Sequence, residues 1–556
     1  MLRALLLATT LTAAAFAQPV DLLLVNGNIH TLDATQPHAT ALAVRAGRIV
    51  FVGDDASAAA FRATARRTID LRGATVVPGL TDAHIHLEGI GARELTFDLE
   101  GTASVADLQA RLAARVAQTH AKQWIVGRGW IETHWQPPVF PTRAALDAVA
   151  PDHPVVLTRA DGHALVANSL ALRLAKVDAA TPNPSGGEVL KDAAGEPTGV
   201  LVDHAMRLVT RLIPPATAAE TERALIVGAA REGQLGWTSV HVAGQNFATS
   251  EMVRRLVAEG KIKLRIFDAV SGSDGSGEKL LAAGLVVGES DGRYTRRGVK
   301  LYMDGALGSR GAALLEPYAD YASTGLLLQD EAKFAAFLVA ALRGGVQVQT
   351  HAIGDRGNRV VLDAYKKAFA AVPPGERAQP DPRWRIEHAQ IIHPDDLGRF
   401  AALGVIASMQ PSHAIGDLFF APRRLGRERL VGAYAWRSLL DSGAIIASGS
   451  DAPVERGEPM IEFYAAVARR SLDGFANEDW HLAQRMTRLE ALRAMTLDAA
   501  YAAFAENEWG SLVVGKWADL TVLSADIMTI PEPEILQTKC LLTVIGGEVV
   551  FDASNP

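Results

Sequence analysis

The sequence predicts an α/β fold: a (β/α)8 TIM-like barrel, with a small β-sandwich formed from both chain ends and a long insertion after barrel strand 1. Three observations support this fold. Eight short β-rich runs end in polar residues, most intervals between them carry a helical pattern, and both chain ends alternate apolar and polar residues around turns. A chain of 556 residues, 49% of them hydrophobic, can bury a barrel with such additions.

The barrel prediction depends on eight runs that recur along the chain. They are ATVVPGLTDAH (74–84), WTSVHVAG (237–244), KLRIFDAV (263–270), GVKLYMDG (298–305), VQVQTHAIGD (346–355), WRIEHAQ (384–390), GVIASMQP (404–411) and AIIASGSDAP (444–453). A helical pattern such as EAKFAAFLVAALRGG fills most of the intervals. Eight alternations of strand and helix indicate a closed parallel barrel.

Both chain ends predict a second, smaller β-structure. DLLLVNGNIHTLD and GSLVVGKWADLTVLSAD, near the start and the end, each alternate apolar and polar residues, so we expect one β-sandwich. Roughly 130 residues separate the first two barrel strands, far more than an ordinary connection, and such an insertion often supplies a lid or a pocket. The expected boundaries are a signal peptide at 1–17, sandwich at 18–73, barrel at 74–500 with an insertion at about 97–230, and sandwich at 501–556.

The first residues, MLRALLLATTLTAAAFAQ, predict an export signal. Arg3 gives a positive start, an apolar stretch follows, and Ala15 and Ala17 fit the small-x-small cleavage rule. We therefore expect an exported protein, periplasmic or secreted; the alternative is a cytosolic chain with an apolar start. The run is shorter than the ~20 residues of a membrane span, so we expect no span in the mature chain.

Net charge and cysteine content limit which partners the protein can bind and which side chains can be metal ligands. A net charge of -7 and the lack of a long basic run argue against nucleic acid and favour a small-molecule substrate. Cys540 is the single cysteine, which excludes an internal disulfide and multi-thiolate metal sites. Oligomerisation stays possible.

Polar side chains gather at the predicted carboxyl ends of five barrel strands, where side chains converge on one site. They are His84, His86, Lys300, His351, His388 and Asp451. Neutral imidazole and carboxylate are the ligands that Zn²⁺ favours, and a lysine carbamylated by CO₂ could bridge two metals. Alone, an HxH pair is a weak signal and a strand-end histidine is more often a hydrogen-bonded core residue. The conjunction of six favours a site for one or two divalent metal ions, with zinc expected.

Longer motifs make the family recognisable. PGLTDAHIHLEG, GRGWIETHW, VKLYMDGALGSRGAAL, HAIGDRGN, RIEHAQ, ASMQPSHAIGD and ASGSDAPVE resemble the amidohydrolase superfamily, and within it the YtcJ-like amidohydrolase-3 group, which includes N-substituted formamide deformylases. The resemblance implies that His84, His86 and Asp451 hold the more buried metal. It also implies that His351 and His388 hold the other, bridged by a carboxylated Lys300.

The expected activity follows from this ligand set. A metal lowers the pKa of bound water towards about 7, and Asp451 can take its proton and return it to a leaving nitrogen. We expect a metal-dependent amidohydrolase that cleaves an amide-type C–N bond, other than a peptide bond, in an N-substituted amide or formamide by metal-activated water. The alternatives are a deaminase or cyclic-amide hydrolase with the same metal site, and a binding protein without turnover.

Five further residues are candidates for contact with the substrate: Trp130, His163, Arg310, Gln410 and His413. Gln410 and His413 follow strand seven, where they could contact substrate or support the ligands. Trp130 and His163 lie in the insertion, although core packing is at least as probable for the tryptophan. Arg310 could pair with an anionic substrate group or form a structural ion pair.

Overall fold

The computed structural model describes residues 18–120, 122–160, 162–184 and 186–555. The export signal predicted over residues 1–17 lies outside the described residues. The chain divides into two compact units, which we call unit 1 (up to Gly91 and from Ala224 onward) and unit 2 (Ala92–Arg223). In the part of the chain that is described, no helix is both long and apolar enough to cross a membrane.

Unit 1 contains the predicted parallel barrel. Its strands, in spatial order, are β22 (Ile446–Ser448), β21 (Ile406–Met409), β20 (Arg385–His388), β19 (Gln347–Ala352), β18 (Tyr294–Tyr302), β16 (Arg265–Ser271), β15 (Trp237–Gln245) and β8 (Leu80–Ile85). Just after β22, the N–H of Asp451 donates to the carbonyl of His84 in β8 at 2.8 Å. This bond joins the last barrel strand to the first, and the barrel fold is confirmed.

The run at 74–84 contains two strands rather than one. β7 (Thr75–Pro78) pairs with strands from the chain ends, and only β8 enters the barrel. Gly79 separates them, and a Cβ there would come within 2.3 Å of the Thr238 hydroxyl. Glycine therefore allows the chain to pass from one sheet to the other, and the first barrel strand begins later than the sequence pattern predicts.

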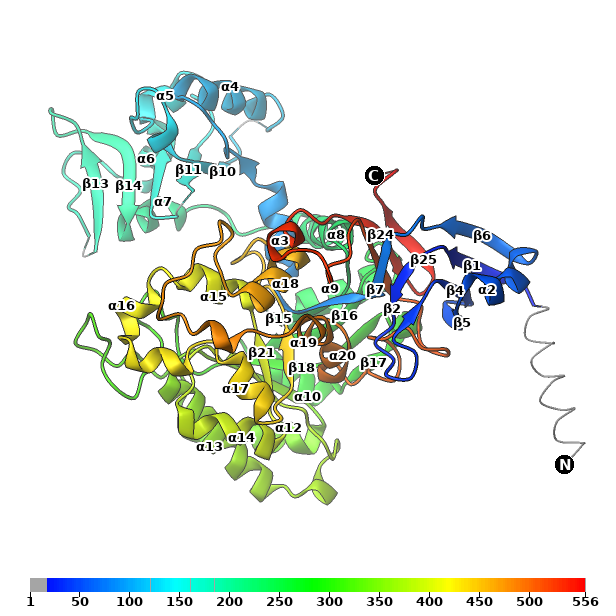
Figure 1. Cartoon of the computed structure of the whole chain (residues 1–556). Coiled ribbons are helices and arrows are strands. Elements are labelled where there is room, and N and C mark those ends of the chain that lie inside the picture. The colour runs from blue at the N-terminus through cyan, green and yellow to red at the C-terminus, as the bar shows by residue number, and fades with distance from the viewer. Residues whose placement is uncertain (1–17, 121, 161, 185, 556) are drawn as a thin grey trace, which may run out of the picture. The chain divides into compact units, whose positions relative to one another are not determined.

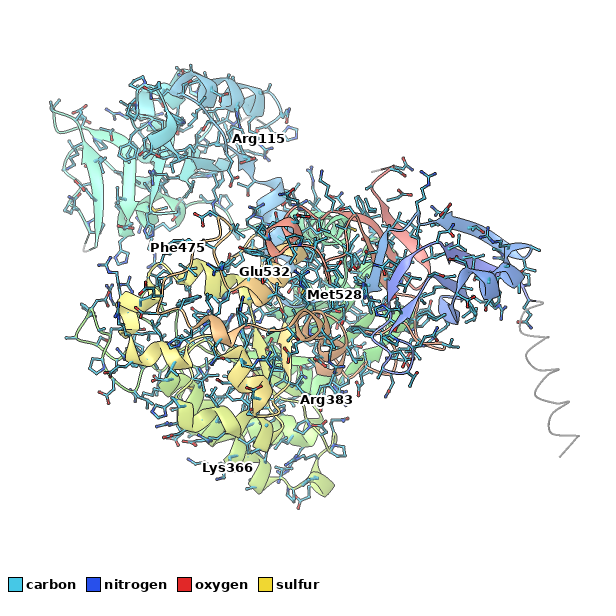
Figure 2. The ribbon with its side chains drawn as sticks, in the orientation of Figure 1. Arg115, Lys366, Arg383, Phe475, Met528 and Glu532 are labelled. Atoms are coloured by element: carbon cyan, nitrogen blue, oxygen red, sulfur yellow. The ribbon has the colours of Figure 1, made fainter. Side chains whose placement is uncertain are left out.

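Helices surround the barrel strands (Figure 1), and side chains fill the space between them (Figure 2). They are α8 (Ala218–Leu235), α9 (Phe247–Ala258), α10 (Ser276–Ala283), α11 (Glu289–Gly292), α12 (Glu331–Gly344), α13 (Asp355–Ala371), α14 (Pro394–Leu403), α15 (Pro411–Asp417), α16 (Ala421–Leu425), α17 (Trp436–Asp441), α18 (Pro459–Ala468), α19 (Arg488–Ala494), α20 (Leu497–Ala502) and α21 (Glu532–Ile535). The local sequence sets their ends. In α12, the Asp330 side chain accepts from the N–H of Lys333, and Gly345 ends the helix in the left-handed conformation.

The chain ends form two sheets of unit 1. One contains β1 (Val20–Val25), β4 (Ala41–Arg45), β5 (Arg48–Gly53) and β6 (Ala65–Asp70), beside α2 (Asp55–Arg62). The other contains β2 (Asn28–His30), β3 (His38–Ala39), β7, β23 (Leu520–Leu523), β24 (Cys540–Ile545) and β25 (Glu548–Asp552), so the blue and red ends of the chain lie side by side (Figure 1). Leu24 and Val44 of the first sheet share an apolar core with Val76 and Val522 of the second.

Unit 2 has its own sheet and its own cores. Its strands are β9 (Phe97–Asp98), β10 (Ile125–Trp130), β11 (Val155–Arg159), β12 (Ala164–Ala167), β13 (Gly187–Lys191) and β14 (Pro197–Asp203), and its helices are α4 (Val105–Val116), α5 (Arg143–Asp147), α6 (Ser169–Ala175) and α7 (Arg207–Thr210). α3 (Leu87–Leu95) leads into it after β8. The unit occupies the place in the chain where the long interval predicts an insertion.

Candidate metal centre

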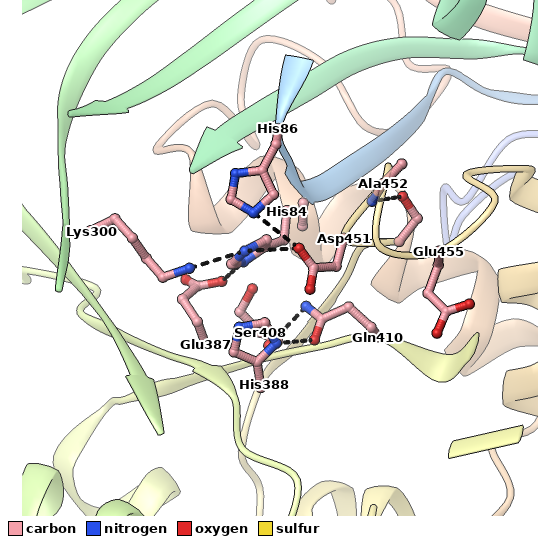
Figure 3. A network of polar contacts seen from close by, with 12 residues as sticks. His84, His86, Lys300, Glu387, His388, Ser408, Gln410, Asp451, Ala452 and Glu455 are labelled. Atoms are coloured by element: carbon pink, nitrogen blue, oxygen red, sulfur yellow. Dashed lines mark hydrogen bonds and ion pairs between the residues drawn. The ribbon is translucent and has the colours of Figure 1, made fainter. Parts of the chain in front are cut away.

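Histidine, lysine and aspartate side chains from several barrel strands meet at the carboxyl ends (Figure 3). The Nζ of Lys300 lies 3.1 Å from the Nε2 of His84, which lies 3.7 Å from the Oδ1 of Asp451. The His388 ring centroid is 4.9 Å from that of His84 and 4.5 Å from that of His351. Five of the six predicted residues therefore share one buried region.

His86 completes the group from just beyond the end of β8. Its Nε2 lies 3.1 Å from the Oδ1 of Asp451, and its ring lies 5.7 Å from that of His84. Residues 84 and 86 are two apart on an extended chain, so both side chains point to the same face. His86 is the more exposed of the two, with 36% of its side chain accessible.

Burial and neighbouring charges give these groups the protonation states that a cation needs. Burial, reinforced by Lys300, lowers the pKa of His84 to about 4 and that of His351 to about 3. The pKa of His388 is also well below its usual value, chiefly through burial. Burial alone would raise the pKa of Asp451, but the hydrogen bond from His86 and the nearby imidazoles hold it well below its usual range. Neutral imidazoles thus face an ionised carboxylate.

Hydrogen bonds behind the rings fix which nitrogen faces the centre. The Nδ1 of His84 donates to the buried carboxylate of Glu387, so its Nε2 lone pair points inward. The Nδ1 of His388 lies 2.8 Å from the Oε1 of Gln410 and donates to it, which leaves its Nε2 as the acceptor. Gln410 was a candidate for either substrate contact or ligand support, and its observed contact is support.

The donor set fits a divalent cation. One ligand atom each from His84, His388 and Asp451 lie within 4.8 Å of one another, and all three residues are buried. Atoms that bind one Zn²⁺ at about 2.0–2.2 Å must lie this close together. The His351 Nε2 is buried and has no hydrogen-bond partner among the described residues. The cluster therefore has the spacing and the open valences of a metal site.

Asp304 was not predicted from the sequence and lies beside His351. Its Oδ1 lies 3.6 Å from the His351 Nε2, and its carboxylate accepts from the N–H groups of Ala313, Ile353 and Gly354 at 2.8 to 2.9 Å. Asp304 lies two residues beyond the end of β18, in KLYMDG. A carboxylate at the end of a barrel strand is a signal that could have identified it.

His413 lies beside the cluster at the start of α15. Its Nε2 is 3.5 Å from the Oδ2 of Asp451, and its Nδ1 accepts from the Nε2 of Gln390 at 2.9 Å. That bond leaves the proton of the neutral ring on Nε2, directed towards Asp451. His413 is mostly buried, so the geometry brings this candidate to the metal centre.

The remaining candidates have other surroundings. Arg310 forms a bidentate pair with Asp320, at 2.9 and 3.1 Å, which is the structural ion pair named as its alternative. Trp130 is completely buried in the core of unit 2 and donates from its indole to the carbonyl of Leu157 at 2.8 Å, so it has the core position rather than that of a pocket wall. His163, also in unit 2, is exposed beside Asp203.

Comparison with known proteins places the chain in a family. Residues 67–551 match the family model described as Amidohydrolase family. Protein LONG AFTER FAR-RED 3 of Arabidopsis thaliana is 35% identical over 96% of this chain and 91% of that protein. YtcJ of Bacillus subtilis (strain 168) is 31% identical over 87% of this chain and 90% of that protein.

Two further similarities bear on the chemistry of the family. The N-substituted formamide deformylase of Arthrobacter pascens is 30% identical over 96% of this chain and 99% of that protein. A crystal structure of a metal-dependent hydrolase from Pyrococcus furiosus superposes with a TM-score of 0.74 at 28% identity, covering 91% of this chain and all of that one. The resemblance drawn from the sequence motifs is confirmed. The chain belongs to the Amidohydrolase family and is a hydrolase of carbon–nitrogen bonds other than peptide bonds.

Proposed function

We propose that this protein hydrolyses the C–N bond of an N-substituted amide or formamide with the help of one or two divalent cations, zinc by preference. The observation that carries the proposal is the convergence of neutral imidazoles and an ionised Asp451 at the carboxyl ends of the barrel strands. Similarity to an N-substituted formamide deformylase over 96% of this chain supports the substrate class.

Five of the six side chains divide into two sets of ligands. In this proposal His84, His86 and Asp451 hold the more buried cation, while His351 and His388 hold the other. A bound divalent cation lowers the pKa of a coordinated water towards about 7 and polarises the substrate carbonyl. Asp304 and Glu387 do not bind metal in this assignment. Glu387 orients the His84 ring through Nδ1, and Asp304 lies beside the His351 ring.

Asp451 and His413 act on protons and on the substrate oxygen. The ionised Asp451 accepts a proton from the attacking water and returns it to the leaving nitrogen. His413 directs an N–H towards Asp451, since Gln390 occupies its other nitrogen. The same N–H can donate to the carbonyl oxygen of a substrate at the cluster and stabilise the charge that develops there.

Lys300, as a carbamate, would be the sixth ligand. Burial lowers the pKa of its amine to about 8, which enlarges the neutral fraction that reacts with CO₂. The amine nitrogen bonds to the carbon of CO₂ and loses a proton, and the product is an anion with two oxygen ligands. An unmodified lysine leaves a cationic ammonium 3.1 Å from the His84 Nε2, where it would oppose metal binding.

The test combines metal analysis with a substrate screen. Purified protein is assayed for bound metal and for hydrolysis of N-substituted formamides, N-acyl amino acids and cyclic amides. We expect stoichiometric zinc and release of formate or another acid together with an amine. Ammonia release from an amino-substituted ring would instead favour the deaminase, and metal-loaded protein that binds these compounds without turnover would favour a binding protein.

Two variants distinguish loss of a metal ligand from the general effect of removing a histidine. His351→Ala should lose most turnover and part of the metal while the fold stays intact. His120→Ala removes an exposed histidine and should change neither quantity. Wild-type activity with full metal content in His351→Ala would remove this residue from the site.

We also propose export to the periplasm or the medium, on the strength of the N-terminal pattern described above. N-terminal sequencing of protein from intact cells, fractionated by osmotic shock, tests this. Cleavage after Ala17 and release with the periplasmic fraction are expected. A full-length chain in the cytosolic fraction would contradict it.

A further inference from the structure

A cavity of about 400 Å³ lies in unit 1 at the amino ends of β15, β16 and β18, away from the metal centre at their carboxyl ends. The chain that follows α20 covers one side and contributes Phe504, Trp509 and Trp517. Arg48 and Arg265 stack on Trp517, with their Cζ atoms 3.9 and 4.9 Å from the ring centroid. Seven of the seventeen lining residues are aromatic or arginine, and the acidic residues Asp291 and Glu508 also line the cavity.

Arg297, which also lines this cavity, is a buried cation without an acidic partner in the part of the chain that the structure describes. Among the described residues, its hydrogen bonds are those from Nη2 to the carbonyl of Gly345 at 3.2 Å and to the Gln379 amide oxygen at 3.4 Å. Its guanidinium stacks on Phe504 at 3.8 Å, and only 8% of the residue is exposed. The other two arginines of the cavity pair with acids, Arg48 with Glu508 and Arg265 with Asp519.

Arg469 is a buried arginine whose positive charge is compensated by hydrogen bonds from all three of its side-chain nitrogens. Arg469 also has no acidic partner among the described residues, but its Nε, Nη1 and Nη2 each donate to a backbone carbonyl at 2.8 to 2.9 Å. Arg297 makes only the two longer bonds from one nitrogen. Its positive charge is therefore the less compensated of the two, and a buried charge without partners is costly.

The electrostatic surroundings of Arg297 agree with this geometry. Burial, together with the charge of Arg383, lowers the pKa of Arg297 to about 10. Arg383, labelled in Figure 2, is itself paired with Asp381 and Glu506. Of the two acidic residues that line the cavity, Glu508 is paired with Arg48, and no ion pair joins Asp291 to Arg297 among the described residues. An anion in the cavity would supply a counter-charge to Arg297.

We propose that this cavity binds a small aromatic carboxylate. The charge of Arg297 selects an anion, and the Trp509 ring, with the apolar side chains of Ile266 and Val287, favours a planar apolar body. The volume lies within the range of small-molecule sites. Arg297 precedes Lys300 by three residues on β18, a distance of about 10 Å along the strand. The site is thus distinct from the metal centre, and the inference goes beyond the proposed hydrolysis.

Calorimetric titration of the metal-loaded protein tests the proposal with three probes. Benzoate carries both the ring and the charge, sulfate only charge, and benzamide only the ring. We expect benzoate to bind at least about tenfold more tightly than either of the others, because a charge-assisted hydrogen bond adds to ring stacking. Absent benzoate binding, or equal binding of benzoate and benzamide, would overturn the proposal.

Two variants locate the binding. Arg297→Met should weaken benzoate binding about tenfold or more, while Arg343→Met, which removes an exposed arginine, should leave it unchanged. Removing an uncompensated buried charge should leave Tm unchanged or raise it. Val287→Trp places a large ring at an exposed edge of the same cavity and should also weaken binding, so it decides the matter if Arg297→Met does not fold.

A carboxylate can also bind metal, so the titration is repeated with His351→Ala. Benzoate binding that survives in this variant supports the cavity. Binding that is lost in His351→Ala but persists in both Arg297→Met and Val287→Trp would place benzoate at the metal centre and overturn the proposal.

Discussion

Two buried charge clusters lie at opposite ends of the barrel strands, and they are built differently. At the amino end of β16, Arg265 donates from Nε and Nη2 to both oxygens of Asp519, which lies just before β23. At the carboxyl ends, His84 donates outward to Glu387 while its other nitrogen faces Asp451. We call Arg265 and Asp519 the closed cluster, because each satisfies the other. We call the six residues His84, His86, Lys300, His351, His388 and Asp451 the open cluster, because their polar atoms face a shared space.

The difference separates a stabilising role from a binding role. A bidentate pair that satisfies both partners leaves nothing for a ligand, and it joins the barrel to the β-sandwich. In the open cluster, ligand atoms of His84, His388 and Asp451 lie within 4.8 Å of one another, around a space that a cation can occupy. Loss of function without loss of fold should therefore be confined to the open cluster.

The largest expected effect is at Asp451. Asp451→Asn removes a metal ligand and the proposed proton acceptor together, so kcat/KM should fall by roughly 10²- to 10⁴-fold. Steady-state kinetics on the best substrate of the screen, with metal content measured on the same sample, provide the test. Near-normal turnover in Asp451→Asn would show that the open cluster is not the active site.

Asp519→Asn tests the closed cluster and should give the opposite result. It leaves the Arg265 guanidinium buried without a carboxylate, which should destabilise unit 1 by about 3–5 kcal/mol. Denaturant unfolding measures this loss, while metal content and kcat/KM of the folded fraction should stay close to wild type. A variant with intact stability but lost metal would reverse the distinction between the two clusters.

Much of the open cluster could be predicted from the sequence because each ligand follows a recognisable strand. His84, His351 and His388 lie at strand ends, and the ends of parallel strands must meet at one face of a barrel. The closed cluster could not be found in this way. Arg265 and Asp519 lie 254 residues apart, and nothing in either local sequence indicates that they pair.

The same limit explains the sequence predictions that the structure altered. Every residue of β7 and β8 is buried, so the sequence pattern of the run at 74–84 does not show that the chain passes from one sheet to another at Gly79. Trp130 is a residue type that often lines pockets, but here its indole N–H donates to the carbonyl of Leu157 inside unit 2. Asp304 was missed because its importance depends on three backbone N–H groups that only the folded loops bring together.

Glu387→Gln sharpens the comparison, because Glu387 accepts a hydrogen bond from His84 of the open cluster without being one of its six residues. The carboxylate should stay ionised: burial raises its pKa, but Arg385 and His84 hold it well below the usual range. A neutral amide orients the His84 ring less firmly, so metal affinity should fall about 10- to 100-fold. Competition with a chelator measures this, and Glu278→Gln, at an exposed glutamate, serves as the control. Unchanged affinity would make Glu387 a purely structural residue.

In metal-free protein, Lys300 should make the free energy of unfolding depend on pH. Burial lowers its pKa from 10.5 to about 8, so between these values the unfolded chain binds more protons than the folded one. Stability should rise with pH across that window, by up to about 1.4 kcal/mol per pH unit, and this contribution should be flat below it. Urea unfolding of chelator-treated protein from pH 7.5 to 10 tests the slope. Lys300→Met should lack it, and equal slopes in the two proteins would contradict the argument.

The smallest effect is expected at Arg310, which the sequence alone left between two roles. Its pairing with Asp320 resembles the closed cluster, although it is more exposed, and Asp320 also accepts from Arg424. Arg310→Met therefore leaves Asp320 with a partner, and kcat/KM should change by less than about twofold. Substrates with and without a carboxylate distinguish the roles. A rise in KM of tenfold or more that is confined to the anionic substrates would mean that Arg310 leaves Asp320 to bind them, and that a closed pair can open.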